Sequence, residues 1–269
     1  MNKNKVLDLG TDAQGNSNYY YGLGIGGDTS PNRTEAGHPI GAFYVQRYLG
    51  VYQSQAEIDA NPFYLSNGVL VTPGTAKFLD VNKDGKINDD DRMYVGSPEP
   101  DFFGGIGNEF SYKNFTLNIF ANFSVGGKIY SNMLRGLEKG DGYWNQTKWY
   151  YNHYWTPDRN TDVARPARGV ANNGTYGHQT TSDRYLFDAS YLRIKNISLA
   201  YRFPDKIVHS LCLSGLRVYA SLDNYFTFTK YRGIDPAINS QGSNATSMGI
   251  DNFSYPLAKS MSFGFNVEF

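Results

Sequence analysis

The feature that most constrains the fold is a strict alternation of apolar and polar residues in KSMSFGFNVEF, residues 259–269. Apolar side chains stand at every second position from Met261 to Phe269, with Ser, Gly, Asn and Glu between them. Because successive side chains of a β-strand point to opposite faces, this period of two predicts a strand with one apolar and one polar face.

The same alternation recurs in three other segments: FTLNIFANFSV (residues 115–125), YLRIKNISLAYRF (191–203) and LRVYASLDNYFTFT (216–229). In residues 191–203 the apolar phase slips at Lys195 and Asn196, which predicts a β-bulge there. Lys113 and Asn114 separate residues 102–112 from residues 115–125, and this spacing predicts a tight hairpin turn. Residues 40–49, IGAFYVQRYL, predict a further strand whose phase is ambiguous.

The connections between these strands are unequal in length. Residues 113–114 and 204–215 are short links, whereas residues 52–100, 131–190 and 231–256 are long and polar. Long strands with short turns at one end and long loops at the other are typical of an antiparallel transmembrane β-barrel of the outer-membrane kind. The alternative is a soluble β-sandwich or jelly roll, in which the apolar faces would meet in a core.

The net charge, the single cysteine and the distribution of apolar residues narrow the possible classes of protein further. Lys and Arg number 25 against 25 Asp and Glu, and this zero net charge argues against nucleic-acid binding. The single cysteine, Cys212, excludes an intramolecular disulfide. No apolar run approaches the ~20 residues of a transmembrane helix, and the start of the chain lacks a signal peptide. We therefore expect either a cytosolic protein or a chain whose true N-terminus is missing.

A calcium-loop motif lies in the first long polar stretch, at DVNKDGKINDDDR, residues 80–92. Calcium loops place oxygen ligands at positions one, three, five, seven, nine and twelve, with Gly at six for the sharp turn. Gly85 stands at that sixth position, and Asp91 takes the last position, where an EF-hand has Glu. The candidate ligands are Asp80, Asn82, Asp84, the carbonyl of Lys86, Asn88 and Asp91.

This spacing favours structural Ca²⁺ over a solvated Asn/Asp turn. No helices with regular apolar spacing flank the motif, so we expect a clip that orders a loop with little apolar surface of its own to bury, and not a switch.

A second candidate site is the aromatic segment YWNQTKWYYNHYW, residues 143–155. It holds Trp144, Trp149 and Trp155, which are all three tryptophans of the chain. The rings could stack on sugars or meet a partner protein. Packing within the loop, or a ring girdle at the membrane interface, is the interpretation that we favour.

Several segments carry, in order, a resemblance to one known family over nearly the whole chain. They include RTEAGHPIGAFYVQRYLGVYQSQAEID, FLDVNKDGKINDDDRMYVGSPEPDFFGGIGNEFSYKNFTLNIF, GGKIYSN, WTPDRNTDVARPAR, SDRYLFDASYLRIKNISLAYRFP, LRVYASLDNYFTFTKYRGIDP and YPLAKSMSFGFNVEF. The chain resembles the C-terminal part of SusC/RagA-type TonB-dependent outer-membrane transporters of Bacteroidetes. The signal, the TonB-contact segment and the plug domain of that family have no counterpart here.

The resemblance implies that residues 1–269 are the C-terminal part of a receptor barrel, with extracellular loops at 52–100 and 131–190. About eight strands can be placed, against about 22 in a large plugged barrel, so we expect a fragment. The resemblance also implies that a whole receptor imports oligosaccharides or peptides through the outer membrane, beneath a SusD-like surface lipoprotein. Energy would come from the TonB complex through the missing N-terminal part, and the strand ending at Phe269 would close the barrel.

Two other classes of protein remain open at this point. One is a secreted, calcium-stabilised β-sandwich that binds glycans through the aromatic segment. The other is a calcium-dependent hydrolase, although no pair of carboxylates is singled out and an enzyme is not expected.

Overall fold

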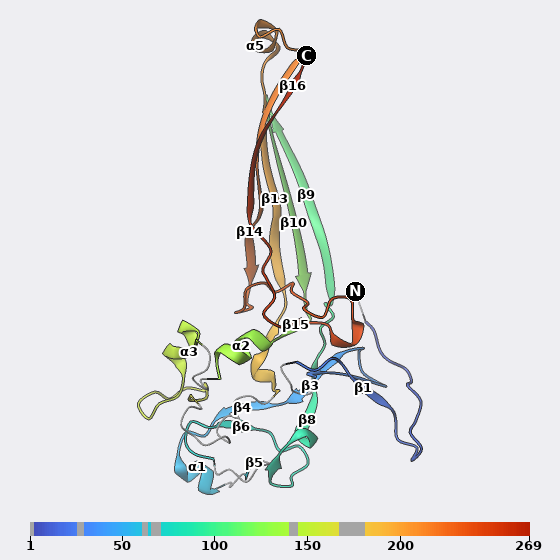
Figure 1. The fold of residues 1–269 in the computed structure, drawn as a ribbon, viewed down its shortest axis with the longest axis vertical. Coiled ribbons are helices and arrows are strands. Elements are labelled where there is room, and N and C mark those ends of the chain that lie inside the picture. The colour runs from blue at the N-terminus through green and yellow to red at the C-terminus, as the bar shows by residue number, and fades with distance from the viewer. Residues whose placement is uncertain (1–2, 26–29, 61–63, 66–70, 140–144, 167–180) are drawn as a thin grey trace.

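The computed structural model describes residues 3–25, 30–60, 64–65, 71–139, 145–166 and 181–269. Its most prominent element is one tall antiparallel sheet of five long strands, in the order β16-β14-β13-β10-β9 (Figure 1). The strands are β9 (Phe102–Tyr112), β10 (Phe115–Val125), β13 (Tyr191–Arg202), β14 (Gly215–Thr229) and β16 (Ser260–Glu268). The sheet is open, so β9 and β16 form its two edges.

The short links all lie at one end of this sheet. Lys113 has a φ of 52° in the turn between β9 and β10, and α5 (Asp205–Ser210) lies in the link between β13 and β14. The register of β13 shifts at Lys195 against both β10 and β14, which confirms the predicted bulge. Four of the predicted strands are therefore correct, and their register places the expected apolar residues that it pairs on one face.

The other end of the sheet carries the remaining described residues, which we call the loop region: those within 3–101, 126–190 and 230–259 (Figure 1). Its largest sheet has the order β1-β2-β3-β8, formed by β1 (Tyr19–Tyr21), β2 (Asn32–Glu35), β3 (Ala42–Gln46) and β8 (Arg92–Gly96). A second sheet has the order β12-β11-β15, from β11 (Lys128–Ser131), β12 (Leu186–Asp188) and β15 (Ile250–Asp251).

Small pairs and short helices complete the loop region. The pairs are β4 (Tyr48–Val51) with β6 (Ala76–Phe78), and β5 (Tyr64–Leu65) with β7 (Lys86–Ile87). The α-helices are α1 (Gln55–Ala60), α2 (Asn132–Leu137) and α3 (Lys148–His153), and the 3-10 turns are Asp89–Asp91, Asp183–Tyr185 and Ala245–Ser247. No helix in the described part of the chain has the length and apolarity that crossing a membrane requires.

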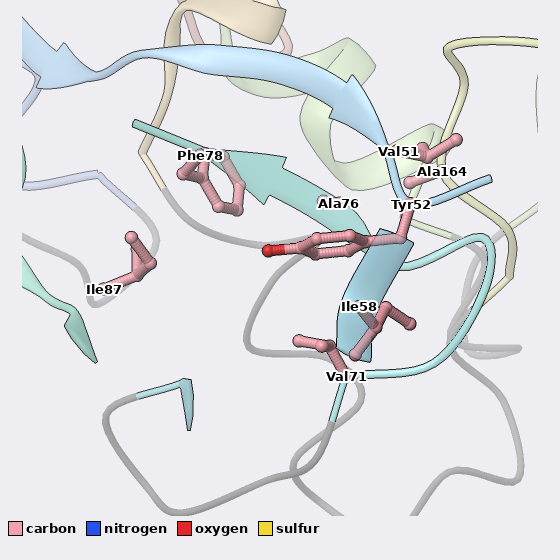
Figure 2. Packing of buried hydrophobic residues seen from close by; sticks show 8 residues of the cluster. All are labelled: Val51, Tyr52, Ile58, Val71, Ala76, Phe78, Ile87 and Ala164. Atoms are coloured by element: carbon pink, nitrogen blue, oxygen red, sulfur yellow. The ribbon is translucent and has the colours of Figure 1, made fainter. Parts of the chain in front are cut away.

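The buried core lies in the loop region and not in the long sheet. Among the described residues, all buried apolar side chains except Ala200 and Val208 belong to the loop region. Figure 2 shows one cluster: Val51, Tyr52, Ile58, Val71, Ala76, Phe78, Ile87 and Ala164. A second cluster joins Ile25, Phe43, Tyr130, Met133, Leu134, Tyr185 and Ile250.

Residues 40–49 do not form the single strand that the sequence predicts. The segment divides at Arg47 into β3, which pairs with β2 and β8, and β4, which pairs with β6. The carboxylate of Asp183 accepts hydrogen bonds from the Tyr48 amide (2.7 Å) and pairs with the Arg47 side chain (2.9 Å). At Tyr48 the backbone amide thus bonds to a side chain from a distant segment and not to a neighbouring strand. The local sequence pattern does not reveal this contact.

Candidate functional site

The long sheet has one almost continuous apolar face. The register places the rows Phe115–Tyr201–Val218–Phe265 and Leu117–Leu199–Ala220–Phe263 side by side across four strands. These side chains are largely uncovered: Phe263 is 76% and Phe265 73% exposed. In water such a face would be strongly unfavourable, because an exposed apolar patch of this extent needs a partner surface.

The opposite face of the sheet is polar. Its side chains are mostly hydroxyls, amides and charged groups: Glu109, Ser111, Thr116, Asn118, Asn122, Ser124, Arg193, Asn196, Ser198, Arg202, Arg217, Ser221, Asp223, Thr227, Ser260, Ser262, Asn266 and Glu268. The apolar side chains of this sheet are exposed and do not meet in a core, so the alternative of a β-sandwich is wrong. One apolar and one polar face, both uncovered, is the arrangement of a barrel wall between lipid and an aqueous lumen.

Buried polar contacts attach the loop region to the sheet. Arg193 of β13 pairs with Asp235 at 2.5 Å, with side chains only 4% and 7% exposed. The hydroxyl of Tyr231 donates a hydrogen bond to Asp251 at 2.5 Å and also contacts the Ser131 hydroxyl. Burial, followed by the hydrogen bond to Asp251, raises the pKa of Tyr231, so this phenol stays a neutral donor. The Arg193–Asp235 pair fixes the loop after β14 against the start of β13, and the contacts of Tyr231 join that loop to β11 and β15.

The predicted calcium loop is ordered by its own backbone hydrogen bonds. Asp80 accepts from the amides of Lys83 (2.6 Å) and Gly85 (2.9 Å), and Asn82 accepts from the Asp84 amide (3.0 Å). Asp84 in turn accepts from the Lys86 amide at 2.8 Å. Gly85 has a φ of 79°, so the sharp turn expected at the sixth position is present.

The last two candidate ligands behave differently, because they form a capping box. Asp91 is fully buried, and its two carboxylate oxygens accept from the amides of Val81 (2.9 Å) and Asn88 (2.8 Å). Asn88 caps the 3-10 turn by accepting from the Asp90 amide at 2.6 Å. Asp91 therefore holds the two ends of the loop together through backbone amides alone.

The donor set fits calcium only in part. Asp80, Asn82, Asp84 and Asn88 supply hard oxygens, which is the chemistry Ca²⁺ prefers. Within the described ranges, however, no three His, Cys, Asp or Glu side chains are grouped so as to hold a metal ion. Of the apolar side chains of this loop, Ile87 is 4% exposed and joins the cluster of Figure 2, whereas Val81 is 43% exposed.

Most of the described aromatic segment is occupied by internal packing. Tyr150 is fully buried and donates its hydroxyl to the carbonyl of Ala164 at 3.0 Å. Trp155 packs against the cluster of Figure 2 and donates its indole N–H to Gln53 at 2.8 Å. Tyr143 and Trp144 lie outside the described residues. Tyr150 thus packs within its own loop and Trp155 against the loop of residues 52–100, and neither ring is a free sugar platform.

Trp149 and Tyr151 are the outward rings of this segment, 39% and 65% exposed. The guanidinium of Arg232 lies 3.6 Å from the Trp149 ring centre, and the ring of His153 stacks on Trp149 at 4.7 Å. Arg232 also pairs with the buried Glu138 at 2.7 Å. The Trp149 ring is thus held in place by two cationic or polar neighbours.

A tyrosine cluster on the β1-β2-β3-β8 sheet could not be predicted from the sequence pattern alone. The guanidinium of Arg33 lies 3.7 Å from the ring centre of Tyr19 and 4.4 Å from that of Tyr44. Glu35 pairs with Arg33 at 2.8 Å and accepts from the Tyr94 hydroxyl at 2.6 Å. The run YYY at residues 19–21 was the available signal, but its partners come from three other strands.

Comparison with known proteins identifies the class of protein that has this arrangement. The chain is 37% identical to TonB-dependent receptor P3 of Formosa agariphila over 87% of its length, and 31% identical to TonB-dependent receptor P26 of the same organism over 100%. It is 28% identical to TonB-dependent receptor SusC of Bacteroides thetaiotaomicron, again over 100%. No model of a known protein family matches the chain.

Solved structures show the same fold. The structure of the RagAB peptide transporter superposes with a TM-score of 0.68 at 22% identity, covering 94% of this chain and 24% of that one. The RagAB peptide importer in its open-open state gives a TM-score of 0.66, with 96% and 25% covered. The sheet is therefore a segment of an antiparallel transmembrane β-barrel.

The chain belongs to the TonB-dependent receptors and is similar to SusC among them. It spans about a quarter of the length of the curated relatives it matches: 22% of receptor P3, 26% of P26 and 25% of SusC. These relatives are receptors and not enzymes, which agrees with the expectation from the sequence.

Proposed function

We propose that the chain forms part of the wall and the exterior mouth of a TonB-dependent transporter in the outer membrane. The observation that carries this proposal is the almost continuous apolar face of the five-stranded sheet, backed by a polar face. The apolar face meets lipid and the polar face meets the lumen. The loop region, joined to the long-loop end of the sheet, then lies at the cell exterior, because barrels of this kind have short periplasmic turns and long outer loops.

The whole receptor imports oligosaccharides or peptides together with a SusD-like surface lipoprotein. Support comes from the similarity to SusC and from the shared fold with the RagAB peptide transporter. Import is driven by the TonB complex, which contacts the receptor through segments outside this chain.

The loop of residues 80–91 binds calcium as a structural clip at the mouth. Asp80, Asn82, Asp84, the Lys86 carbonyl and Asn88 supply oxygen ligands, and Asp91 holds the ends of the loop. The spacing of these residues and the turn at Gly85 support this role. A divalent charge would relieve the repulsion among the acidic groups of the loop, because it offers each of them an opposite charge at short range.

Deletion of the gene for the whole receptor in its native host tests the transport function. We expect loss of growth on one class of polymer, either a glycan or a peptide mixture, and recovery of the receptor in the outer-membrane fraction of the wild type. Undiminished growth on all such polymers, with the receptor found in soluble fractions, would contradict the proposal.

A further inference from the structure

A shallow groove of about 590 Å³ lies on the apolar face of the long sheet, near the end that carries the short turns. Its floor is the part of β14 that holds Val218 and Ala220. The groove exists because these two small side chains stand between larger ones of the neighbouring strands β13 and β16. The larger side chains are Leu199, Tyr201, Phe263 and Phe265, with Phe115 of β10 beyond Tyr201.

Both walls of the groove are supported by packing. Gly264 lies between the two phenylalanines of the β16 wall, and a Cβ at this glycine would overlap the ring of Tyr219. Because Tyr219 is the register partner of Gly264, its ring lies directly on the backbone of β16. On the other wall, the rings of Tyr201 and Phe115 pack with 4.7 Å between their centres. The groove is therefore a fixed feature of the sheet.

Tyrosines and a lysine mark the level of the groove in the membrane. The row Tyr112–Phe115–Tyr201 lies at the short-turn end of the sheet. Tyrosine rings of membrane proteins gather at the membrane–water interface, and the short turns of such barrels are periplasmic. Lys113 lies in the adjacent turn, with its ammonium group 5.4 Å from the centre of the Tyr112 ring. The groove therefore starts at the headgroup level of the periplasmic leaflet and runs along β14 into the hydrocarbon.

A hollow at this depth is filled by whatever surrounds the barrel. Empty space would forfeit the van der Waals contacts that its lining can make, and the surrounding medium is hydrocarbon chains. The lining side chains on this face carry no charge, and the Tyr201 hydroxyl is their only polar group. We infer that the groove holds one acyl chain of a phospholipid of the periplasmic leaflet in a fixed position, with the headgroup at the level of Lys113.

The surroundings of the groove favour a lipid over a protein as the occupant. Protein interfaces have a polar rim around their apolar centre. Here the next row into the membrane is Ile119–Ile197–Leu222–Met261, so the apolar surface continues beyond the groove. An acyl chain in the groove contacts the protein on three sides, whereas a chain on the flat part of the sheet contacts it on one. This inference rests on the proposed place of the sheet in the outer membrane and adds a ligand to it.

The test uses the whole receptor, purified in detergent, stripped of lipid and titrated with dipalmitoyl phosphatidylethanolamine. Native mass spectrometry counts the bound phospholipids. The wild type is expected to bind one phospholipid more tightly than any further ones.

Ala220→Phe fills the floor of the groove, and Ala121→Phe is its matched control. Ala121 lies on the same face, in β10, and does not line the groove. We expect Ala220→Phe to weaken binding of the first phospholipid about tenfold, which corresponds to the loss of roughly ten carbon–carbon contacts. Ala121→Phe should leave the binding unchanged.

A second pair of variants keeps the test informative if Ala220→Phe does not assemble. Phe263→Ala removes one wall and should also weaken binding of the first phospholipid. Phe110→Ala is its control, because Phe110 is exposed on the same face of β9 and does not line the groove. In cells, p-benzoylphenylalanine in place of Phe263 should cross-link to phospholipid on irradiation.

Two results would overturn the inference. The first is equal binding by the wild type and both groove variants, which would mean that only bulk lipid surrounds the sheet. The second is a cross-link from position 263 to a protein, which would mean that a protein covers the groove. Both results leave the receptor in the outer membrane. A receptor that is absent from the outer-membrane fraction would instead contradict the proposed function itself.

Discussion

The long sheet and the loop region use the same kinds of residue in opposite ways. In the sheet, Phe263, Phe265 and Phe110 are 76%, 73% and 58% exposed, whereas Phe43 and Tyr130 of the loop region are fully buried. The sheet is held together by interstrand hydrogen bonds, and its apolar face is left free to contact lipid. The loop region instead buries its apolar residues against each other, as a water-soluble domain does.

The difference shows that a period of two does not by itself reveal what covers an apolar face. It also shows that a polar composition does not make a long loop disordered. Residues 52–100 and 131–190 are polar on average, yet their described parts supply all but Val51 of the first buried cluster and Met133, Leu134 and Tyr185 of the second. Five experiments test this contrast between the two regions.

The largest effect should be on the solubility of the isolated chain in plain buffer. Because the apolar face of the sheet is uncovered, we expect the isolated chain to be insoluble without detergent or to form intermolecular sheets through its β9 and β16 edges. Analytical ultracentrifugation with and without detergent measures this. A monodisperse monomer in plain buffer would mean that the apolar face is covered and would remove the contrast.

The next largest effect should be the loss of stability caused by a cavity in the loop region. Phe43→Ala removes a fully buried ring, and we expect a loss of about 3–5 kcal/mol in the free energy of unfolding of the loop region. Phe265→Leu in the sheet is the control, since its side chain is 73% exposed and contributes little in the folded chain. Thermal unfolding in detergent compares the two variants. Equal destabilisation by both would contradict the assignment of the core to the loop region.

A charge placed on each face of the sheet separates lipid from lumen. Leu222→Arg puts a cation in the middle of the apolar face of β14, and Ser221→Arg puts the same cation on the polar face one residue away. We expect Leu222→Arg to cost about 2–4 kcal/mol at the bilayer midplane and to lower membrane abundance, while Ser221→Arg is tolerated. Equal abundance of the two variants in the outer membrane would be inconsistent with a lipid-facing wall.

Calcium should act on the loop region alone. Chelation is expected to increase hydrogen exchange in residues 79–92 and to leave the five long strands unchanged, because only the folded loop presents the ligands together. Asp80→Ala with Asp84→Ala should remove the response to calcium. If calcium does not change exchange in the wild type, the metal proposal is wrong and the capping box of Asn88 and Asp91 is the sufficient clip.

The smallest effect concerns pH. A hydrogen bond from Lys77, followed by one from the Gln53 amide, lowers the pKa of Glu57 from its ordinary value. A lowered carboxyl pKa adds stability above the pKa of the unfolded chain, near 4.3, and loses it as the pH falls through the folded value. The pair is partly exposed, so we expect at most ~1 kcal/mol. Between pH 5 and pH 3, the free energy of unfolding of the loop region should depend less on pH in Glu57→Gln than in the wild type, and the sheet should be unaffected. An equal dependence on pH in the two proteins would contradict this.

Much of the sheet could be predicted from the sequence, whereas little of the loop region could. Local sequence patterns predict the features that depend on neighbours in sequence. These are the bulge at Lys195, the turn at Lys113 and the faces of β10 and β14. The division at Arg47 depends on Asp183, and the burial of Tyr150 depends on Ala164. Of the calcium loop, the spacing was predictable, but the use of Asp91 as a backbone cap was not.

The local sequence pattern is sufficient to show which residues share a face of each long strand, because side-chain direction in a strand follows from backbone geometry alone. It also determined the class of protein, through segments that stand in the same order as in a known family. The burial of a core by the long loops, and their attachment to the sheet through Arg193 and Asp235, become visible only in the folded chain. These features arise from contacts between residues far apart in the chain, and such contacts form only when the whole fold brings the segments together.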